Sequence, residues 1–205
     1  MRKALVVAAS ISGLLLTTAA PAAAAAPVRE KDSGNFSSLN SSTSECNPEG
    51  AGQTCTDIFL FASTDTSGQG YVSLNIETYS VSEQGEFTHI SSEFGFSEGA
   101  SLTVTSDFDA MLAETRMTLQ TFTCTPESCE EEVSREVVVS ASDTAVGPAF
   151  TSRQRGTFRD GTCTFRFSST LTGAPVEGTI TIDGVTYDET GTAEVGKYRV
   201  MQRCK

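Results

Sequence analysis

Apolar and polar residues alternate along much of the chain, and this period of two is typical of β-strands rather than helices. The segment from Thr56 to Ser63 is the clearest case, because apolar residues occupy both of its sides. One side carries Phe59 and Phe61, and the other carries Ile58, Leu60 and Ala62. Two apolar sides predict a central strand that is covered on both faces.

Further strand patterns follow at regular spacing. The apolar residues between Val72 and Ile76 share one face, whereas Tyr79 has the opposite parity, which predicts a β-bulge near Glu77. The next strands are expected over residues 87–96 and 101–105.

The segment from Ser106 to Thr115 allows two interpretations. Ser106 could cap a short helix, but the run is short for a helix and continues directly into residues that favour a strand. We therefore favour a turn at Asp107 to Asp109, followed by a strand.

The stretch from Phe150 to Val195 contains two Asp-Gly dipeptides between strand patterns, which predicts a β-meander. Asp-Gly favours the tight type I′ hairpin turn, because both of its central residues need a positive φ. With the dipeptide at 183–184 as the loop, the expected register pairs apolar residues across the hairpin: Ile182 with Val185 and Ile180 with Tyr187.

The dipeptide at 160–161 sorts its flanking residues into two unlike faces. One face is largely aromatic, with Phe158, Phe165 and Phe167, and the other carries Arg153, Arg155, Arg159 and Arg166. This register places Arg155 directly opposite Arg166, and like charges in that position destabilise a strand pair by a few tenths to about 1 kcal/mol. The four arginines are therefore candidates for binding an anionic ligand; alternatively, carboxylates of a neighbouring strand neutralise them.

Together these patterns predict an all-β fold. We expect a single antiparallel meander that forms a β-barrel or a β-sandwich of about eight to ten strands, stabilised by disulfides.

The start of the chain has the order of a secretory signal peptide. Arg2 and Lys3 precede an apolar run that ends at Leu16, and small residues follow up to Ala26. The run is shorter than the roughly 20 residues of a membrane-spanning helix. We expect residues 1–25 to be removed, residues 26–54 to form a flexible lead rich in Ser, Gly and Asn, and residues 55–205 to form one secreted, extracellular domain.

Six cysteines in such a chain predict three disulfides formed in an oxidising compartment. Their spacing favours a sequential pairing: Cys46 with Cys55, Cys124 with Cys129, and Cys163 with Cys204. A zinc site is disfavoured, because the chain has a single His and only one pair of cysteines comes near the spacing of a zinc motif. We predict no metal and no cofactor.

The formal net charge of −12 argues against nucleic acid and anionic membranes as partners. Catalytic patterns are sparse, since there is no G-x-S-x-G motif and His89 would have to serve as the base of any triad. We therefore expect a non-enzymatic domain that binds an unknown extracellular ligand or partner. Two alternatives stay open: a secreted hydrolase that uses acidic residues, and a protease-inhibitor-like protein that presents the loop at 124–129.

Three segments carry a resemblance to known sequences: Val146 to Pro148, Asp160 to Phe165 and Gly178 to Gly184. They look like a pattern in uncharacterised secreted all-β proteins of actinobacteria, over roughly the C-terminal third to half of the chain. The resemblance implies secretion and a β-fold, and it implies no activity.

Overall fold

The computed structural model describes residues 29–65, 67–124 and 129–204, so the predicted signal peptide lies outside the described residues. The described residues form ten antiparallel β-strands and no helix, which confirms the all-β prediction. The strands are β1 (Arg29–Glu49), β2 (Gly52–Thr64), β3 (Gly70–Val81), β4 (Phe87–Ala100), β5 (Leu102–Val104), β6 (Ala110–Cys124), β7 (Cys129–Ala145), β8 (Phe150–Asp160), β9 (Cys163–Ile182) and β10 (Val185–Cys204). A search of this part of the chain for a helix long and apolar enough to cross a membrane finds none.

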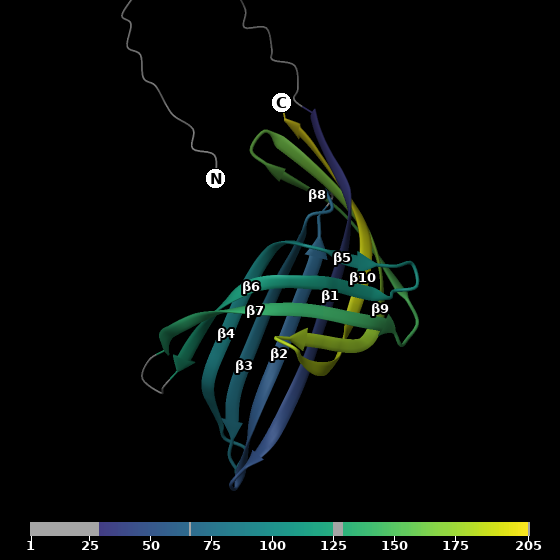
Figure 1. The fold of residues 1–205 in the computed structure, drawn as a ribbon. Coiled ribbons are helices and arrows are strands. Elements are labelled where there is room, and N and C mark those ends of the chain that lie inside the picture. The colour runs from purple at the N-terminus through teal and green to yellow at the C-terminus, as the bar shows by residue number, and fades with distance from the viewer. Residues whose placement is uncertain (1–28, 66, 125–128, 205) are drawn as a thin grey trace, which may run out of the picture.

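All ten strands belong to one sheet, which closes on itself as a ring (Figure 1). Its neighbours run in the order β10, β1, β2, β3, β4, β6, β7 and β9, and the pairing of β9 with β10 completes the ring. Two strands lie off this path, since β5 pairs with β6 and β8 pairs with β9. The predicted meander is thus observed with two departures: β4 skips the short β5 and pairs with β6, and β7 skips β8 and pairs with β9.

Alternate residues of the ring strands point inward and form the core. The largest of these side chains are fully buried: Leu39, Leu60, Leu74, Leu112, Leu119 and Ile180. Burying one such side chain contributes about 1.5–3 kcal/mol to stability, so the interior of the ring is the main source of stability.

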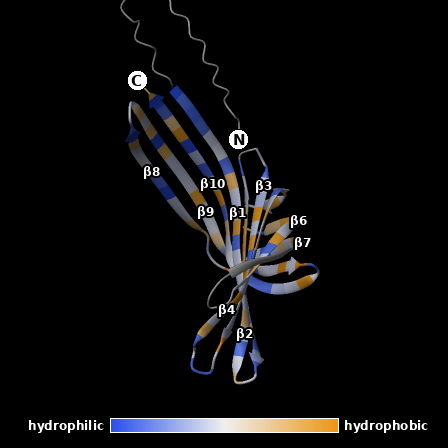
Figure 2. Ribbon diagram, turned by 90° about the vertical axis from the view of Figure 1, so that its left-hand side faces the viewer, coloured by the Kyte–Doolittle hydropathy of each residue, from blue (hydrophilic) through white to orange (hydrophobic). Residues whose placement is uncertain are grey.

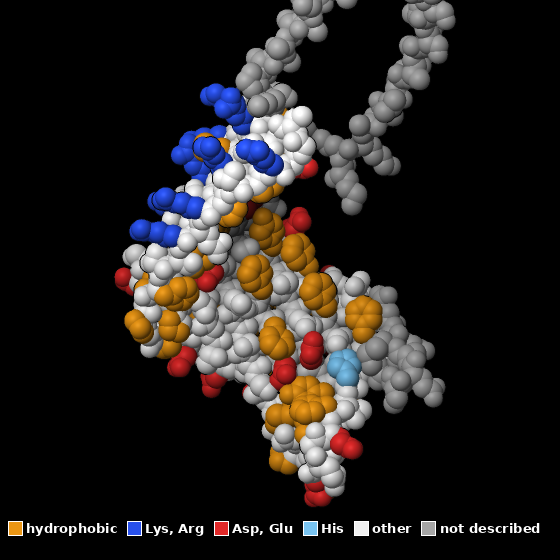
Figure 3. Space-filling view, turned by 180° about the vertical axis from the view of Figure 1, so that it is seen from behind, with side chains coloured by type: hydrophobic (Ala, Val, Ile, Leu, Met, Phe, Trp, Pro, Cys, Tyr) orange, Lys and Arg blue, Asp and Glu red, His pale blue; other side chains and the backbone are white. Residues whose placement is uncertain are grey.

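The outer face of β2 is more exposed than the sequence predicted. The inner face is buried as expected, but Phe59 and Phe61 on the outer face remain 45% and 46% exposed. The reason is topological, because a sheet that closes on itself covers only its inner face. Phe94 and Phe96 of β4 are exposed on the same outer wall, and Figure 3 shows apolar side chains spread over it.

β1 corrects the expectation that residues 26–54 form a flexible lead. It pairs with β10 as far as Ser42 and with β2 from Ser37 onward, so its central part has a neighbour on each side. The polar composition is misleading, because a strand bonded on both edges satisfies its backbone groups without many apolar side chains. The inward-facing Leu39 and Ser41 of β1 are buried inside the ring.

Two local predictions are confirmed, and a third is corrected. Phe108 has a φ of 64° in a turn, and β6 begins directly after it at Ala110, so the segment 106–115 is a turn and a strand. The β3–β4 register shifts between Thr78 and Tyr79, but the extra residue is Ile90 on β4, so the bulge predicted near Glu77 lies on the neighbouring strand. Asp183 and Gly184 have φ values of 50° and 81° between strands paired in the predicted register.

The hairpin between β8 and β9 corrects the predicted register but not the predicted faces. Asp160 pairs with Cys163, so the loop is 161–162 and the strands are displaced by two residues. A displacement of two preserves which residues share a face. Arg155 therefore lies opposite Ser168 rather than Arg166. This register stacks Phe158 on Phe165, with ring centroids 4.7 Å apart.

Four strand segments extend beyond the ring and form a flat extension that we call the arm (Figures 1 and 2). The arm consists of residues 150–160 of β8, 163–173 of β9, 195–204 of β10 and 29–37 of β1, side by side in that order.

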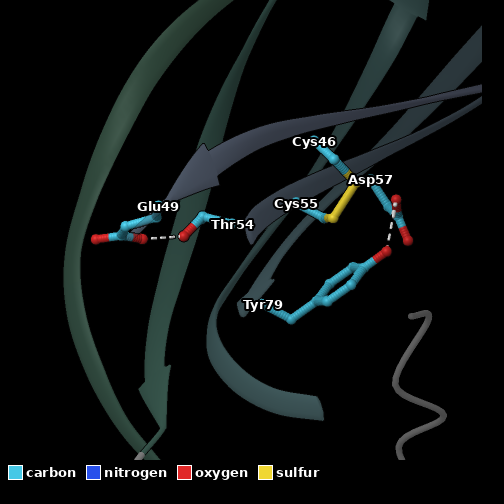
Figure 4. Close-up of a disulfide and its surroundings, with 6 residues drawn as sticks. All are labelled: Cys46, Glu49, Thr54, Cys55, Asp57 and Tyr79. Atoms are coloured by element: carbon cyan, nitrogen blue, oxygen red, sulfur yellow. Dashed lines mark hydrogen bonds between the residues drawn. A yellow bond between two sulfur atoms is a disulfide. The ribbon is translucent and has the colours of Figure 1, made fainter. Parts of the chain in front are cut away.

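Two of the predicted disulfides are confirmed. Cys163–Cys204 joins the ends of β9 and β10 in the arm, and Cys46–Cys55 joins β1 to β2 near the opposite tip. Figure 4 shows the second bridge beside two side-chain hydrogen bonds, from Thr54 to Glu49 and from Tyr79 to Asp57. Cys124 and Cys129 are cross-strand partners of β6 and β7, but their side chains and residues 125–128 lie outside what the structure describes.

Candidate functional site

One face of the arm collects most of the basic residues of the protein. Alternate residues of a strand share a face, so the registers of the four strands place nine cations together. We call this the cationic face: Arg29, Lys31, Arg153, Arg155, Arg159, Arg166, Lys197, Arg199 and Arg203. Figure 3 shows Lys and Arg side chains along the arm.

The cationic face has no acidic residue. Its other positions are Ser, Thr, Asn, Val or Met, and all nine cations are exposed. Among the described residues, none of the nine forms an ion pair; the ion pairs there belong to Arg135, whose guanidinium lies 2.7 Å from Glu93 and 3.1 Å from Asp183. The nine charges are therefore available to an anion from outside.

Three arginines surround a hollow at the centre of this face. Arg155 and Arg199 flank Ser168 in one cross-strand row, two strands apart. Arg166 belongs to the next row on the middle strand, as the diagonal neighbour of both, about 7–8 Å from each. The hollow has a volume of about 490 Å³ and is also lined by Thr157 and Met201. We call it the arginine hollow.

The charge of the rest of the molecule makes this face unusual. Nine of the fourteen Lys and Arg residues lie on it, which leaves five for the remainder of the chain against twenty-six acids. Two like charges about 7 Å apart in water repel by about 0.6 kcal/mol, and the cationic face contains several such pairs. A bound anion would relieve this repulsion and receive charge-assisted, bidentate hydrogen bonds from guanidinium groups.

The opposite face of the arm is aromatic and holds the strands in register. Phe167 covers Gly156 so closely that a Cβ atom on this glycine would lie 2.2 Å from the ring. Gly196 is covered by Phe36 in the same way. A slip of the register would place these rings against side chains, so the aromatic face fixes where the arginines lie on the other side.

All four arginines predicted from the sequence, Arg153, Arg155, Arg159 and Arg166, lie on the cationic face. The prediction that Arg155 and Arg166 belong to one group is supported by the arginine hollow, although they are diagonal rather than opposite. Sequence reasoning missed the five remaining cations. The signal for three of them was visible, because Lys197, Arg199 and Arg203 have the opposite parity to Tyr198 and Val200.

A second cluster lies inside the ring, where sequence reasoning found no candidate. Asp143 on β7 and Glu189 on β10 are 2% and 3% exposed. Burial raises the pKa of both carboxyls, and the negative charge of Asp143 raises the pKa of Glu189 further. The Ser41 hydroxyl beside Glu189 acts in the opposite direction on the pKa of Glu189.

His89 is exposed on β4, and its ring Nε2 lies 2.9 Å from Ser92 Oγ. The loop at 124–129 that suggested an inhibitor lies for the most part outside the described residues.

Comparisons with known proteins identify no family. No protein-family model matches the chain, and no curated protein matches it. Among solved structures, the one titled "Crystal structure of CghA with Sch210972" aligns at 8% identity over 80% of this chain and 87% of that chain. Its TM-score of 0.15 is too low to carry an argument.

Proposed function

We propose that the protein is a secreted, non-enzymatic β-domain that binds an extracellular anionic ligand through the cationic face. The ligand carries phosphate, sulfate or carboxylate groups, and the arginine hollow of Arg155, Arg166 and Arg199 is its central contact. The observation that carries the proposal is the concentration of nine exposed cations, none of them ion-paired with a described residue, on one face of an otherwise acidic protein.

A polymeric or multiply charged anion fits this face best. Cations two residues apart along a strand are about 7 Å apart, and cations two strands apart are about 10 Å apart. A flexible polyanion with a charge at similar intervals can therefore meet several rows at once. A long stiff duplex or an anionic bilayer would also meet the acidic remainder of the molecule, so we retain the expectation that nucleic acid and membranes are not its partners.

The two alternatives have less support. A hydrolase needs carboxyls that touch a substrate, whereas the carboxyls with the largest pKa shifts, Asp143 and Glu189, are almost fully buried. An inhibitor would rely on residues 125–128, which the structure does not describe. Binding to an anion rests on described residues alone.

Binding of the mature protein to polyphosphate, heparin and polyglutamate tests the proposal, with uncharged dextran as the control. We expect at least one polyanion to bind, with an affinity that falls steeply as salt increases. If the three arginines of the hollow each neutralise one charge, the logarithm of the affinity should fall with a slope of about −2 to −3 against the logarithm of the salt concentration. Binding that ignores salt, or equal binding to dextran, would contradict the proposal, and tighter binding to duplex DNA or anionic vesicles would overturn the choice of partner.

A further inference from the structure

The two buried carboxyls of the ring meet across a glycine. Gly178 on β9 pairs with Asp143 of β7 on one side and with Glu189 of β10 on the other. All three residues lie in one cross-strand row that faces the interior. A Cβ atom on Gly178 would lie 2.7 Å from Asp143 Oδ1, so the absence of a side chain there makes the space that both carboxyls enter.

A third side chain completes the cluster. Ser41 of β1 is 2% exposed, packs over Gly191 and lies beside the Glu189 carboxyl. Five buried side-chain oxygens have no hydrogen-bond partner among the described residues, and all of them belong to this cluster: Ser41 Oγ, both carboxyl oxygens of Asp143 and both carboxyl oxygens of Glu189. Buried polar atoms are nearly always satisfied, so five unsatisfied oxygens in one place call for a common partner.

The chemistry of these oxygens selects a cation as that partner. A proton shared between Asp143 and Glu189 would form one hydrogen bond and satisfy at most two of the five oxygens. When both carboxyls are ionised they only accept hydrogen bonds, so they cannot satisfy one another. No basic side chain of the described residues acts on either carboxyl. A buried charge is retained only when it is paired or coordinates a metal, and a divalent cation would balance both charges at once.

We infer that Ser41, Asp143 and Glu189 form a binding site for a hard divalent cation, calcium. All of its protein ligands are oxygens, which calcium prefers, and two carboxylates with one hydroxyl supply up to five of its six to eight ligands. Water would supply the rest, because no third His, Cys, Asp or Glu side chain joins the pair in the described part of the chain. The inference is independent of the proposed function, since the cluster lies inside the ring and the cationic face lies on the arm.

An acidic groove lies beside the site. Glu189 also borders an open groove of about 770 Å³ where β1 separates from β10. Three further acids line the groove, Asp57, Glu177 and Asp188, and it contains no Lys or Arg. An acidic groove raises the local concentration of cations beside the site.

Thermal unfolding and calorimetry of the mature protein test the site. After dialysis against a chelator, calcium chloride should raise the melting temperature until the effect saturates, and calorimetric titration should give one site per chain. Asp143→Asn and Glu189→Gln retain the shape of the side chains and should weaken calcium binding about tenfold or more. Glu136→Gln, which removes the same charge from an exposed position of β7 outside the groove, should bind calcium like the parent protein.

Calcium titration of the parent protein tests the inference even if a variant fails to fold. If calcium changes neither its melting temperature nor the heat of titration, the inference is wrong and the two carboxyls share a proton instead. Calcium binding that survives Glu189→Gln and Asp143→Asn, or that Glu136→Gln abolishes, would place the ion elsewhere and equally refute the site.

Discussion

Replacing Arg155, Arg166 and Arg199 together by alanine is expected to weaken polyanion binding about a thousandfold or more. A hydrogen bond to a charged group contributes about 1.5–3 kcal/mol, and all three guanidinium groups line one hollow. The free energy of unfolding should change little, because the three side chains are exposed and form no ion pair with the described residues. Isothermal titration calorimetry with the polyanion and urea unfolding measure the two quantities.

Arg116→Ala provides the matched control for the arginine hollow. Arg116 is an exposed arginine on β6, so its replacement lowers the net charge without touching the arm. It should leave polyanion binding nearly unchanged. Should the triple variant lose stability while it retains its affinity, the arginines would serve the fold, and the cationic face would not be a binding surface.

Replacing both Cys163 and Cys204 by serine should produce the largest loss of stability, about 4 kcal/mol. The bridge closes a loop with a sequence separation of 41 residues, and the stabilisation from restricting the unfolded chain grows with the length of the loop. Urea unfolding under oxidising conditions measures the change in the free energy of unfolding.

The bridge between Cys46 and Cys55 offers an internal comparison. Its sequence separation is 9 residues, so the double serine variant should lose only about 2.5 kcal/mol. The Cys163/Cys204 variant should also bind polyanions more weakly, since that bridge joins the strands that carry Arg166 and Arg199. An equal or smaller loss for the longer loop would show that the arm contributes little to the cooperative fold.

The features that could be predicted from the sequence depend on neighbouring residues. The turn at Asp183 and Gly184 and the register around it follow from local φ preferences and from a period of two. The pairing of Cys163 with Cys204 was predicted from spacing, and the parity of the last strand agreed with it. The register at Asp160 was wrong by two residues, because the turn alone does not decide it: the observed register stacks Phe158 on Phe165 and places Phe167 over Gly156.

The features that could not be predicted depend on strands that are distant in sequence. Arg29 pairs with Arg203, and nothing local to either residue predicts that pairing. Only the β1–β10 and β9–β10 registers together turn four arginines into a face of nine cations. The cluster of Asp143 and Glu189 was missed for the same reason, since it depends on β7 bypassing β8 to pair with β9.

The most direct test of the account is a titration of arginine side-chain NMR signals with the polyanion that binds best. The Nε–Hε resonances of Arg155, Arg166 and Arg199 should shift together and saturate with the same dissociation constant as calorimetry gives. Arg116 on β6 and the ion-paired Arg135 should keep their positions. Shifts confined to Arg116 or Arg135, or saturable binding with no change at the arginine hollow, would contradict the claim that the cationic face is the binding surface.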